Sequence, residues 1–507
     1  MANPHPPPVI VVGAGLAGLS AAYAALLAGA PSVRLLERAA KPGGNSIKAS
    51  SGINGAPTRF QDVAKYGVDQ SFWDDTVRSA GSRLQASVAE PIRNQRQGLI
   101  SILTNRSASA IDFLADLGVD LSVVAQLGGH SKPRTHRGAG RTPPGAAIVT
   151  TLLAKLKEQG DRFELVTEAE VTKLLLLPAP HENSKAQPHP QAVVVTGVEY
   201  RLHNLDTTQT LHGPVVFAPG GFAGDTHGLL SLHRPDLAGL PSTNDPRPAA
   251  HTLLSAAGAK LVDMESVQVH PTGFVDPANP QAALKFLAPE MLRGEGGVLL
   301  YRGRRVVNEL ATREVVSRVI MALPPSAAAD DEDHVGDRLR QWDVQLLLDP
   351  GTAEAAAGHV VFYLWKGLLR KKKVRELDEV TRETLREYAR VVRGERADGL
   401  GRVAFGHWTL GVAGAGDIDE EAEVCVGSVT PIVHFTMGGA VFNERAQILS
   451  SELGEEEKPI QGLWGAGEIT GGIHGDNRLG GSSLLECVVF GRIAGEQAAQ
   501  SALKAGA

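Results

Sequence analysis

The chain opens with a pattern of apolar and glycine-rich segments that predicts a strand, a helix and a second strand. Val9–Val12 is a short β-branched run, and the glycine-rich stretch Gly13–Gly18 follows it directly. An alanine- and leucine-rich segment then continues to about Leu27, as in a buried helix, and Val33–Leu36 is a second apolar run. This strand–turn–helix–strand order predicts the first unit of a dinucleotide-binding fold.

Further along the chain, apolar residues three or four positions apart predict helices over about 75–117. Apolar runs predict strands at Leu165–Leu177, Val193–Leu202 and Val215–Phe217. Lys371–Lys373 is expected to start a helix in which arginines four residues apart alternate with acidic residues. Charges of both signs along one helix indicate a solvent-exposed face rather than a nucleic-acid patch.

Composition adds limits on size and partners. The 507 residues suffice for two domains, one of which can be inserted into the other. With 50 basic and 56 acidic residues the formal charge is −6, which gives no general attraction to nucleic acid or acidic membranes. The only cysteines, Cys425 and Cys487, are far apart and form no metal-binding or disulfide pattern, as expected in a reducing compartment.

The sequence contains no predicted membrane span or targeting segment. No apolar run approaches the roughly 20 residues that a spanning helix needs. The N-terminal residues MANPHPPP lack the basic region of a signal peptide and the arginine-rich pattern of a transit peptide. We therefore predict a cytoplasmic protein, with a mitochondrial location as the alternative.

The glycine-rich turn carries the first chemical signal. Gly13 permits a tight turn, Gly15 lets the backbone approach a pyrophosphate, and Gly18 lets helix and strand pack closely. The helix N-terminus directs its partial positive charge at the phosphates. Glu37, at the end of the second strand, is placed to accept hydrogen bonds from ribose hydroxyls. A glycine turn without a ligand is the alternative interpretation.

Two later segments favour FAD over NAD. Gly44, Asn45, Ser46 and Gly52 belong to a stretch of glycines and small polar residues just after Glu37, which suits a flavin lying above it. Near the C-terminus, Glu468 follows an apolar run in Gly-Ala-Gly-Glu and is placed to bind a ribityl chain. A nicotinamide enzyme does not need such a contact so late in the chain.

Five separated motifs resemble those of the succinate dehydrogenase and fumarate reductase flavoprotein superfamily. In chain order they are GAGLAG, GGNSIKASSGING, HPTGF, RGEGG with NELATRE, and HFTMGG followed by GAGEITGGIHGDNRLGG. The resemblance spans nearly the whole chain and is strongest to the soluble fumarate reductases, including the fungal and trypanosomatid type. Membrane-bound relatives attach FAD covalently through a histidine near the second motif. This chain has no histidine there, so the resemblance implies non-covalent FAD.

The resemblance also implies a fold class, an α/β protein with a Rossmann-like FAD-binding domain and an inserted α+β capping domain. The FAD-binding domain is predicted to comprise residues 1–264 and 435–507. The capping domain is predicted to comprise residues 265–434. No haem, FMN or iron–sulfur segment accompanies these domains in the sequence, and no second nucleotide motif suggests an NADH site.

Fumarate reduction requires cationic groups for two carboxylates, a hydride donor and a proton donor. By resemblance, Arg478 holds one substrate carboxylate, while His270 and His434 bind the other and polarise the double bond. Arg313 matches the proton donor of the family, and Glu290 with Arg293 matches the proton relay. Because arginine normally stays protonated, the residues alone would not have selected Arg313.

Less specific interpretations of these residues stay open. Arg313 and Arg478 are alternatively structural ion-pair partners, and the two histidines alternatively buried groups without a substrate. Glu290 and Arg293 are alternatively an ordinary pair on a helix surface. Bacterial relatives often carry threonine just before the relay glutamate, whereas Pro289 occupies that position here, which leaves the affinity for substrate open.

Another polar cluster, formed by His130, Arg134, His136 and Arg137, is interpreted as scaffolding beside the flavin. No carboxylate or cysteine accompanies it in the sequence, so we do not predict a metal site there.

Alternative functions are a urocanate reductase, an L-aspartate oxidase or a ketosteroid dehydrogenase on the same scaffold. A flavin-bound redox sensor without turnover is an alternative of another class. We expect a monomer that binds a small dicarboxylate and neither nucleic acid nor a membrane. Reduced flavin, a quinol or a separate reductase are the candidate electron donors.

Overall fold

The computed structural model describes residues 6–140, 142–178, 193–203, 207–326, 339–412 and 417–506. The chain divides into two compact units. Unit 1 comprises residues 1–222, 249–267 and 435–507, and unit 2 comprises residues 223–248 and 268–434. Within the described ranges, none of the helices has both the length and the apolar character to cross a membrane.

Unit 1 contains a large sheet, two small sheets and most of the long helices. Its strands are β1 (Val9–Val12), β2 (Val33–Leu36), β3 (Ile53–Asn54), β4 (Val123–Ala125), β5 (Thr135–Arg137), β6 (Phe163–Val166), β7 (Ala169–Pro178), β8 (Val193–Leu202), β9 (Thr208–His212), β10 (Val215–Phe217), β11 (Leu261–Val262), β19 (Gly439–Ala440), β20 (Gln447–Leu449) and β21 (Pro459–Gly465). Its helices are α1 (Leu16–Leu27), α2 (Val63–Tyr66), α3 (Phe72–Ser79), α4 (Glu90–Asn105), α5 (Ser107–Asp116), α6 (Pro144–Lys157), α8 (His251–Ala256) and α14 (Ser482–Ala505).

The large sheet of unit 1 has the strand order β6-β2-β1-β10-β21-β8-β7, with β20 beside β21 and β9 beside β8. The pairs from β6 to β8 along this order are parallel, whereas β7, β9 and β20 pair antiparallel. The connection from β1 through α1 to the parallel neighbour β2 is the dinucleotide-binding unit that the apolar pattern predicts.

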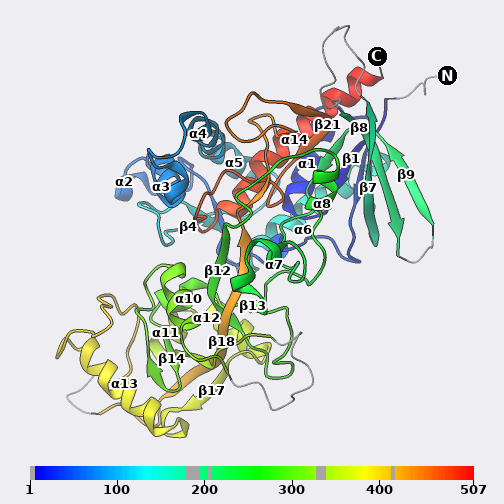
Figure 1. Ribbon diagram of the computed structural model, residues 1–507. Helices are drawn as coiled ribbons and strands as arrows, with labels where there is room; N and C mark the ends of the chain where they lie inside the picture. Colours follow the sequence, from blue (N-terminus) through cyan, green and yellow to red (C-terminus); the bar gives the residue numbers. More distant parts are fainter. Residues whose placement is uncertain are drawn as a thin grey trace, which may run out of the picture. The chain divides into compact units, whose positions relative to one another are not determined.

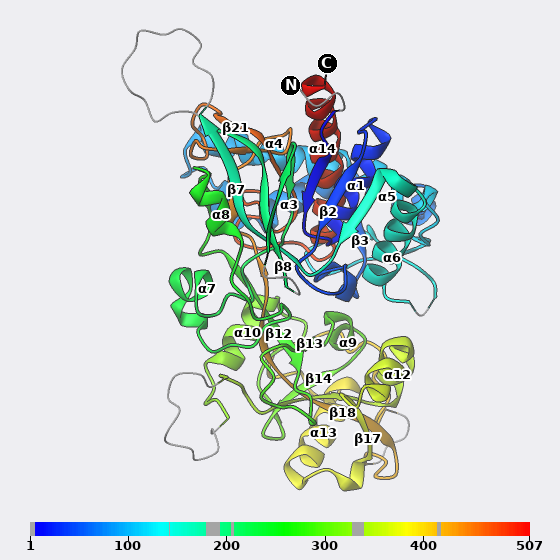
Figure 2. The ribbon, with the colours of Figure 1, turned by 90° about the vertical axis from the view of Figure 1, so that its right-hand side faces the viewer.

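Helix α14, near the C-terminus, packs along α1, near the N-terminus, as both views show (Figures 1 and 2). Two glycines allow this close approach. A Cβ atom at Gly491 would lie 2.5 Å from the carbonyl oxygen of Ala17, and one at Gly495 would lie 2.1 Å from that of Ala21. The first and last long helices of unit 1 therefore share one core.

Unit 2 is built around an antiparallel sheet. Its strands are β12 (Val267–Phe274), which begins in unit 1, β13 (Phe286–Leu287), β14 (Val298–Tyr301), β15 (Arg304–Arg305), β16 (Val344–Leu348), β17 (Arg370–Lys373) and β18 (Glu423–Thr436), which ends in unit 1. Its helices are α7 (Leu229–His233), α9 (Glu290–Gly294), α10 (Arg313–Met321), α11 (Pro350–Ala355), α12 (Ala357–Trp365) and α13 (Glu379–Val392). The strand order is β13-β12-β18-β16-β14-β15, with β17 beside β18. The predicted α/β fold class is confirmed.

Several predicted elements have the expected bounds, and others differ. Strands β1, β2, β8 and β10 match their predicted ranges, and α1 ends at Leu27 as expected. The single strand predicted over 165–177 is two strands, β6 and β7. They are separated at Glu168, whose φ of 57° is left-handed and breaks the extended run.

The prediction that Lys371–Lys373 starts a helix is wrong, because these residues belong to strand β17. They pair antiparallel with β18, where Lys371 lies opposite Cys425 and Lys373 opposite Glu423. The mixed-charge helix begins later, as α13. Residues 223–248 also differ from the predicted domain bounds, since they group with unit 2, where Ser242 bridges to Leu284 and Val433.

Candidate active site

The three glycines of the first turn have distinct surroundings. Gly13 has a φ of +96°, and a Cβ atom there would lie 2.4 Å from the carbonyl oxygen of Ala218. At Gly18 a Cβ atom would lie 1.9 Å from the carbonyl oxygen of Gly13, so the turn and α1 are in direct backbone contact. At Gly15 the nearest atom to such a Cβ is 3.8 Å away. Space is therefore kept at Gly15, at the N-terminus of α1, where a phosphate group fits.

The other predicted cofactor residues of this region gather around the turn. The Glu37 carboxylate accepts hydrogen bonds of 2.8 Å from the backbone N–H groups of Ala14 and Ala39. The Ser46 hydroxyl accepts one of 3.2 Å from the backbone N–H of Leu16. A Cβ atom at Gly44 would lie 3.6 Å from the Cα of Gly15. The structure thus joins the first two motifs into one backbone cradle.

Two more predicted positions have mainly backbone roles. At Gly52, directly before β3, a Cβ atom would lie 2.4 Å from the carbonyl oxygen of His136 on the paired strand β5. Only glycine therefore fits at this position. Asn45 precedes the short helical turn 46–48, and its side-chain oxygen accepts from Lys48 at 3.3 Å. The cradle offers a helix N-terminus, a small hydroxyl and a carboxylate, which fit the pyrophosphate and ribose of FAD.

Glu468 lies in unit 1 just after β21. One carboxylate oxygen accepts hydrogen bonds of 2.9 Å from both the backbone N–H and the hydroxyl of Thr436. Burial, together with the neighbouring carboxylate of Glu486, raises the pKa of Glu468 to about 7. A carboxyl group near its pKa at neutral pH can donate or accept a hydrogen bond, which suits contact with a hydroxylated chain.

Arg134 anchors the polar cluster predicted beside the flavin, and the structure corrects our description of it. Carboxylates do accompany the cluster, because Arg134 binds Asp69 at 2.7 Å and Asp75 at 2.6 Å. Burial and the charge of Arg134 lower the pKa of His130 to about 4, so this histidine is neutral. The ring of His130 contacts the carbonyl oxygen of Gly480 at 3.1 Å. The cluster therefore supports the loop that follows Arg478.

His270 and His434 lie on neighbouring strands of the unit 2 sheet, β12 and β18. Their ring centroids are 5.7 Å apart. Nδ1 of His270 is 3.2 Å from the backbone N–H nitrogen of Thr272, which fixes the orientation of the ring. Burial, with the charge of Arg313, lowers the pKa of His270 well below its usual value. The two histidines are thus brought together, and His270 is neutral.

Arg313 and Glu290 form an ion pair in unit 2. Nε of Arg313 is 2.6 Å from Oε2 of Glu290, and the side chains are 14% and 33% exposed. Arg313 is the first residue of α10, so the partial positive charge of the helix end adds to its own and favours a bound anion. The pair thus combines a mostly buried cation at a helix N-terminus with a carboxylate that is one-third exposed to solvent.

Arg293 is 1% exposed, so it is not part of a helix-surface pair with Glu290. Burial lowers its pKa to about 10. Its Nη1 donates to the carbonyl oxygen of Glu309 at 2.6 Å, while Nε and Nη2 have no hydrogen-bond partner among the described residues. Two unbonded donors in a buried side chain beside Glu290 suit a group that passes protons.

A buried ionic cluster that the sequence did not reveal supports Arg293. Arg402 donates to the carbonyl oxygen of Arg293 at 3.1 Å and to the carboxylate of Glu309 at 3.0 Å. Glu309 also accepts from Arg305, which in turn binds Asp398 at 2.7 Å. Glu309 lies in the NELATRE motif, so the sequence could have indicated this one member of the cluster. Arg402 and Asp398 lie in no motif.

Arg478 lies in unit 1 and is 4% exposed. Its guanidinium carbon is 4.5 Å from the centroid of the Phe435 ring, and Nη1 donates to the carbonyl oxygen of Leu479 at 3.0 Å. Phe435 follows His434 in the HFTMGG motif, but no sequence signal paired it with Arg478.

Pro289 forms the N-cap of α9, directly before Glu290. Its fixed φ is compatible with the start of a helix, so the backbone tolerates it there. The structure gives this position no side-chain hydroxyl for a substrate carboxylate.

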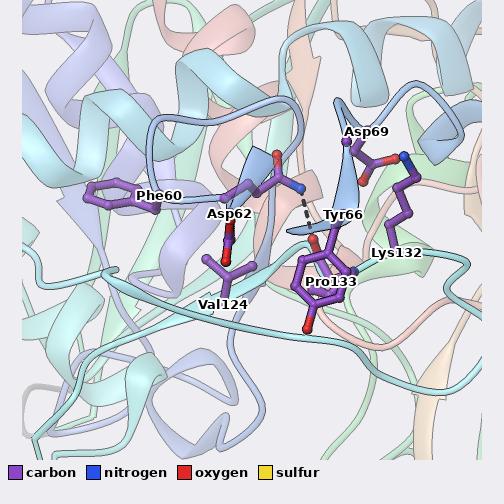
Figure 3. Close-up of a pocket in the computed structure, with 9 residues that line it drawn as sticks. Phe60, Asp62, Tyr66, Asp69, Val124, Lys132 and Pro133 are labelled. Atoms are coloured by element: carbon purple, nitrogen blue, oxygen red, sulfur yellow. Dashed lines mark hydrogen bonds between the residues drawn. The ribbon is translucent and has the colours of Figure 1, made fainter. Parts of the chain in front are cut away.

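A small pocket in unit 1, lined in part by the Asp69 that binds Arg134, has a volume of about 120 Å³ (Figure 3). It is lined by Phe60, Gln61, Asp62, Tyr66, Gly67, Asp69, Val124, Lys132 and Pro133. Gln61 donates to the carbonyl oxygen of Pro133, and Lys132 to that of Val68. A cavity for a cofactor or drug-sized ligand is typically about 300–1,000 Å³, so this pocket is too small for either.

Similarity to known proteins extends over nearly the whole chain. Residues 8–484 match a family model described as "FAD binding domain". The chain is 38% identical to "Fumarate reductase" of Schizosaccharomyces pombe, over 98% of this chain and 90% of that protein. It is also 38% identical to "Fumarate reductase 1" of Saccharomyces cerevisiae, over 97% and 98%.

Among solved structures, the open conformation of a flavocytochrome c3 fumarate reductase is similar. The TM-score is 0.75 at 28% identity, over 98% of this chain and 79% of that one. The family match covers nearly the whole chain, and the glycine cradle has the groups that FAD requires. This chain therefore belongs to the flavoprotein oxidoreductase family that shares this FAD binding domain.

Proposed function

We propose that this protein is a fumarate reductase that transfers a hydride and a proton to fumarate and releases succinate. The observation that carries the proposal is the ion pair of Arg313 with Glu290 in the same unit as the neutral, buried His270. That set combines a proton source with a neutral hydrogen-bond group for a carboxylate. The names of the similar fungal proteins support the same substrate.

FAD supplies the hydride when it is bound and reduced. Arg478 binds one carboxylate of fumarate, because a planar guanidinium matches a carboxylate with two hydrogen bonds. His270 and His434 hydrogen-bond the other carboxylate and draw electron density from the double bond. Since His270 is neutral, it orients and polarises the substrate and does not serve as the acid.

Arg313 donates the proton to the alkene carbon that does not receive the hydride. Its positive charge stabilises the negative charge that develops on that carbon as the hydride arrives. Glu290, 2.6 Å from Nε, then returns a proton to the guanidinium. Arg293, fully buried beside this pair, hands protons on to Glu290.

We also propose that FAD is held without a covalent bond by Gly13, Gly15, Gly18, Glu37, Gly44, Asn45, Ser46, Gly52 and Glu468. The segment Gly44–Ser46 contains no histidine, the residue through which membrane-bound relatives attach the flavin. We propose further that the protein is a monomer of the cytoplasm or mitochondrion. Its electrons come from reduced flavin or from a separate reductase.

The test is the anaerobic oxidation of reduced methyl viologen by the purified flavoprotein. Fumarate, urocanate and iminoaspartate are offered in separate reactions. We expect turnover with fumarate only, and inhibition by succinate and malonate. Turnover with a different acceptor would keep the cofactor but overturn the substrate assignment. A protein that binds FAD and turns over none of the three would favour the redox-sensor hypothesis.

A further inference from the structure

The side chain of Arg478 is stacked on the ring of Phe435. The guanidinium carbon lies 4.5 Å from the ring centroid, and the two residues are 4% and 6% exposed. A guanidinium over an aromatic face is held by the negative potential of that face, and more strongly when water is excluded. In this geometry the ring covers one face of the guanidinium, and Nη1 donates in the plane of the group to the carbonyl oxygen of Leu479.

The Phe435 ring is itself in contact with the buried His474, which is paired with the buried Glu486. The ring of His474 meets it edge to face, with centroids 5.9 Å apart and an interplanar angle of 75°. Nε2 of His474 lies 2.9 Å from the Glu486 carboxylate, and these side chains are 4% and 2% exposed. Glu486 belongs to α14. A continuous set of contacts therefore runs from the long C-terminal helix to the face of Arg478.

The residues on either side of Phe435 also have defined contacts. His434 packs against His270, and Thr436 binds the carboxylate of Glu468. These two contacts fix the strand before and after Phe435, so the ring has little freedom to rotate away from Arg478.

We propose that Phe435 is a positioning residue that orients the guanidinium of Arg478 for two-point binding of a substrate carboxylate. This inference rests on the proposed function and deepens it. Arginine has a long stem with many rotamers, and ordering it only when substrate arrives lowers affinity. A preformed stack removes that cost in advance. Phe435 thereby favours a substrate with a second carboxylate at the Arg478 end.

The experiment compares Phe435→Leu, Phe435→Tyr and the wild-type holoenzyme. The measurements are the KM for fumarate and the Kd of succinate by titration calorimetry. We expect Phe435→Leu to raise both about tenfold, with kcat changed less than about threefold and flavin content unchanged. Phe435→Tyr keeps the aromatic face and should stay within about twofold of wild type. The matched control is Phe442→Leu, a buried phenylalanine that packs on Phe490 instead; it should lower thermal stability and leave KM unchanged.

A double-mutant cycle separates positioning from general packing. In an Arg478→Met background, Phe435→Leu should change the Kd of succinate less than about twofold. An equal effect in both backgrounds would overturn the inference, as would an unchanged KM in Phe435→Leu. If Phe435→Leu loses FAD, Phe435→Met takes its place with the same expected outcomes. A wild-type protein that neither binds succinate nor reduces fumarate would overturn the proposed function, and this inference with it.

Discussion

Two arginines of unit 2 show how burial divides similar side chains between roles. Arg313 is 14% exposed and paired with Glu290, whereas Arg293 is 1% exposed and has two donors unbonded among the described residues. Burial lowers the pKa of Arg293 to about 10, which makes loss of a proton less costly than for a solvated arginine. In the proposed mechanism the more exposed arginine acts on the substrate, and the buried arginine supplies it with protons through Glu290.

The first prediction concerns Arg313. Replacing it with alanine should lower kcat at least about 100-fold, because loss of a positioned acid typically costs 10²–10⁴. The flavin absorbance of the purified protein should not change, since Arg313 belongs to unit 2. Arg318→Ala is the matched control, because Arg318 lies on the same helix with 71% of its side chain exposed. Similar rates for the two variants would contradict the assigned role.

The second prediction follows from Glu468. Its folded-state pKa of about 7 is raised above the usual value of 4.5. In the unfolded apoprotein the carboxyl is ionised above about 4.5, whereas the folded state still binds a proton. The stabilising contribution is therefore complete below pH 4.5 and is lost as pH rises through 7, by roughly 3 kcal/mol.

Denaturation of the apoprotein between pH 4 and 8 measures this loss. The difference in free energy of unfolding between wild type and Glu468→Gln should change by roughly 3 kcal/mol between pH 4 and pH 8. A wild type and a Glu468→Gln variant with parallel pH profiles would show that Glu468 titrates normally.

Secondary-structure elements were predictable where the signal was local. Strand β1, helix α1 and strand β2 follow from a short apolar run, a glycine turn and an alanine-rich segment. Strand β17 was not predictable, because its lysines are ordered by pairing with Glu423 and its neighbours on β18. The links from Arg134 to Asp69 and from Arg478 to Phe435 were missed for the same reason, since both join residues distant in sequence.

The third prediction contrasts two glycines of one element. Gly18→Ala places a methyl group 1.9 Å from the carbonyl oxygen of Gly13, so α1 must separate from the turn and the protein should fail to fold. Gly15→Ala has 3.8 Å to the nearest atom and should fold with a normal circular dichroism spectrum. In the proposed cofactor site this methyl group lies where a phosphate of FAD binds, so the affinity of Gly15→Ala for FAD should fall at least about tenfold. The circular dichroism spectrum measures the folding of each variant, and flavin retention after gel filtration measures FAD binding. Full flavin retention by Gly15→Ala would contradict this account.

At the scale of the molecule, the sequence resemblance anticipated the fold class but not the extent of each unit. Residues 223–248 join unit 2 through the bridges of Ser242 to Leu284 and Val433. Bridges of single residues leave no periodic trace in a sequence, so motif order alone could not assign this segment.

The fourth prediction concerns helix α14. A chain that ends at residue 481 lacks the partner of α1, whose buried face includes Leu16, Leu19 and Ala21. That chain should be purified without flavin and should bind a dye for exposed apolar surface, whereas the full chain should be yellow. A truncated protein that retained FAD would show that unit 1 is stable without α14.

The same packing has a consequence for synthesis on the ribosome. Strand β21 is near the end of the chain, yet it lies between β10 and β8, and α14 follows it onto α1. All residues of unit 2 therefore leave the exit tunnel while unit 1 still lacks its central strand β21. The apolar surface of α1, next to the first glycine turn, stays uncovered until α14 has left the ribosome. Unit 1, and with it the proposed flavin site, is therefore complete only after β21 and α14 have been synthesised.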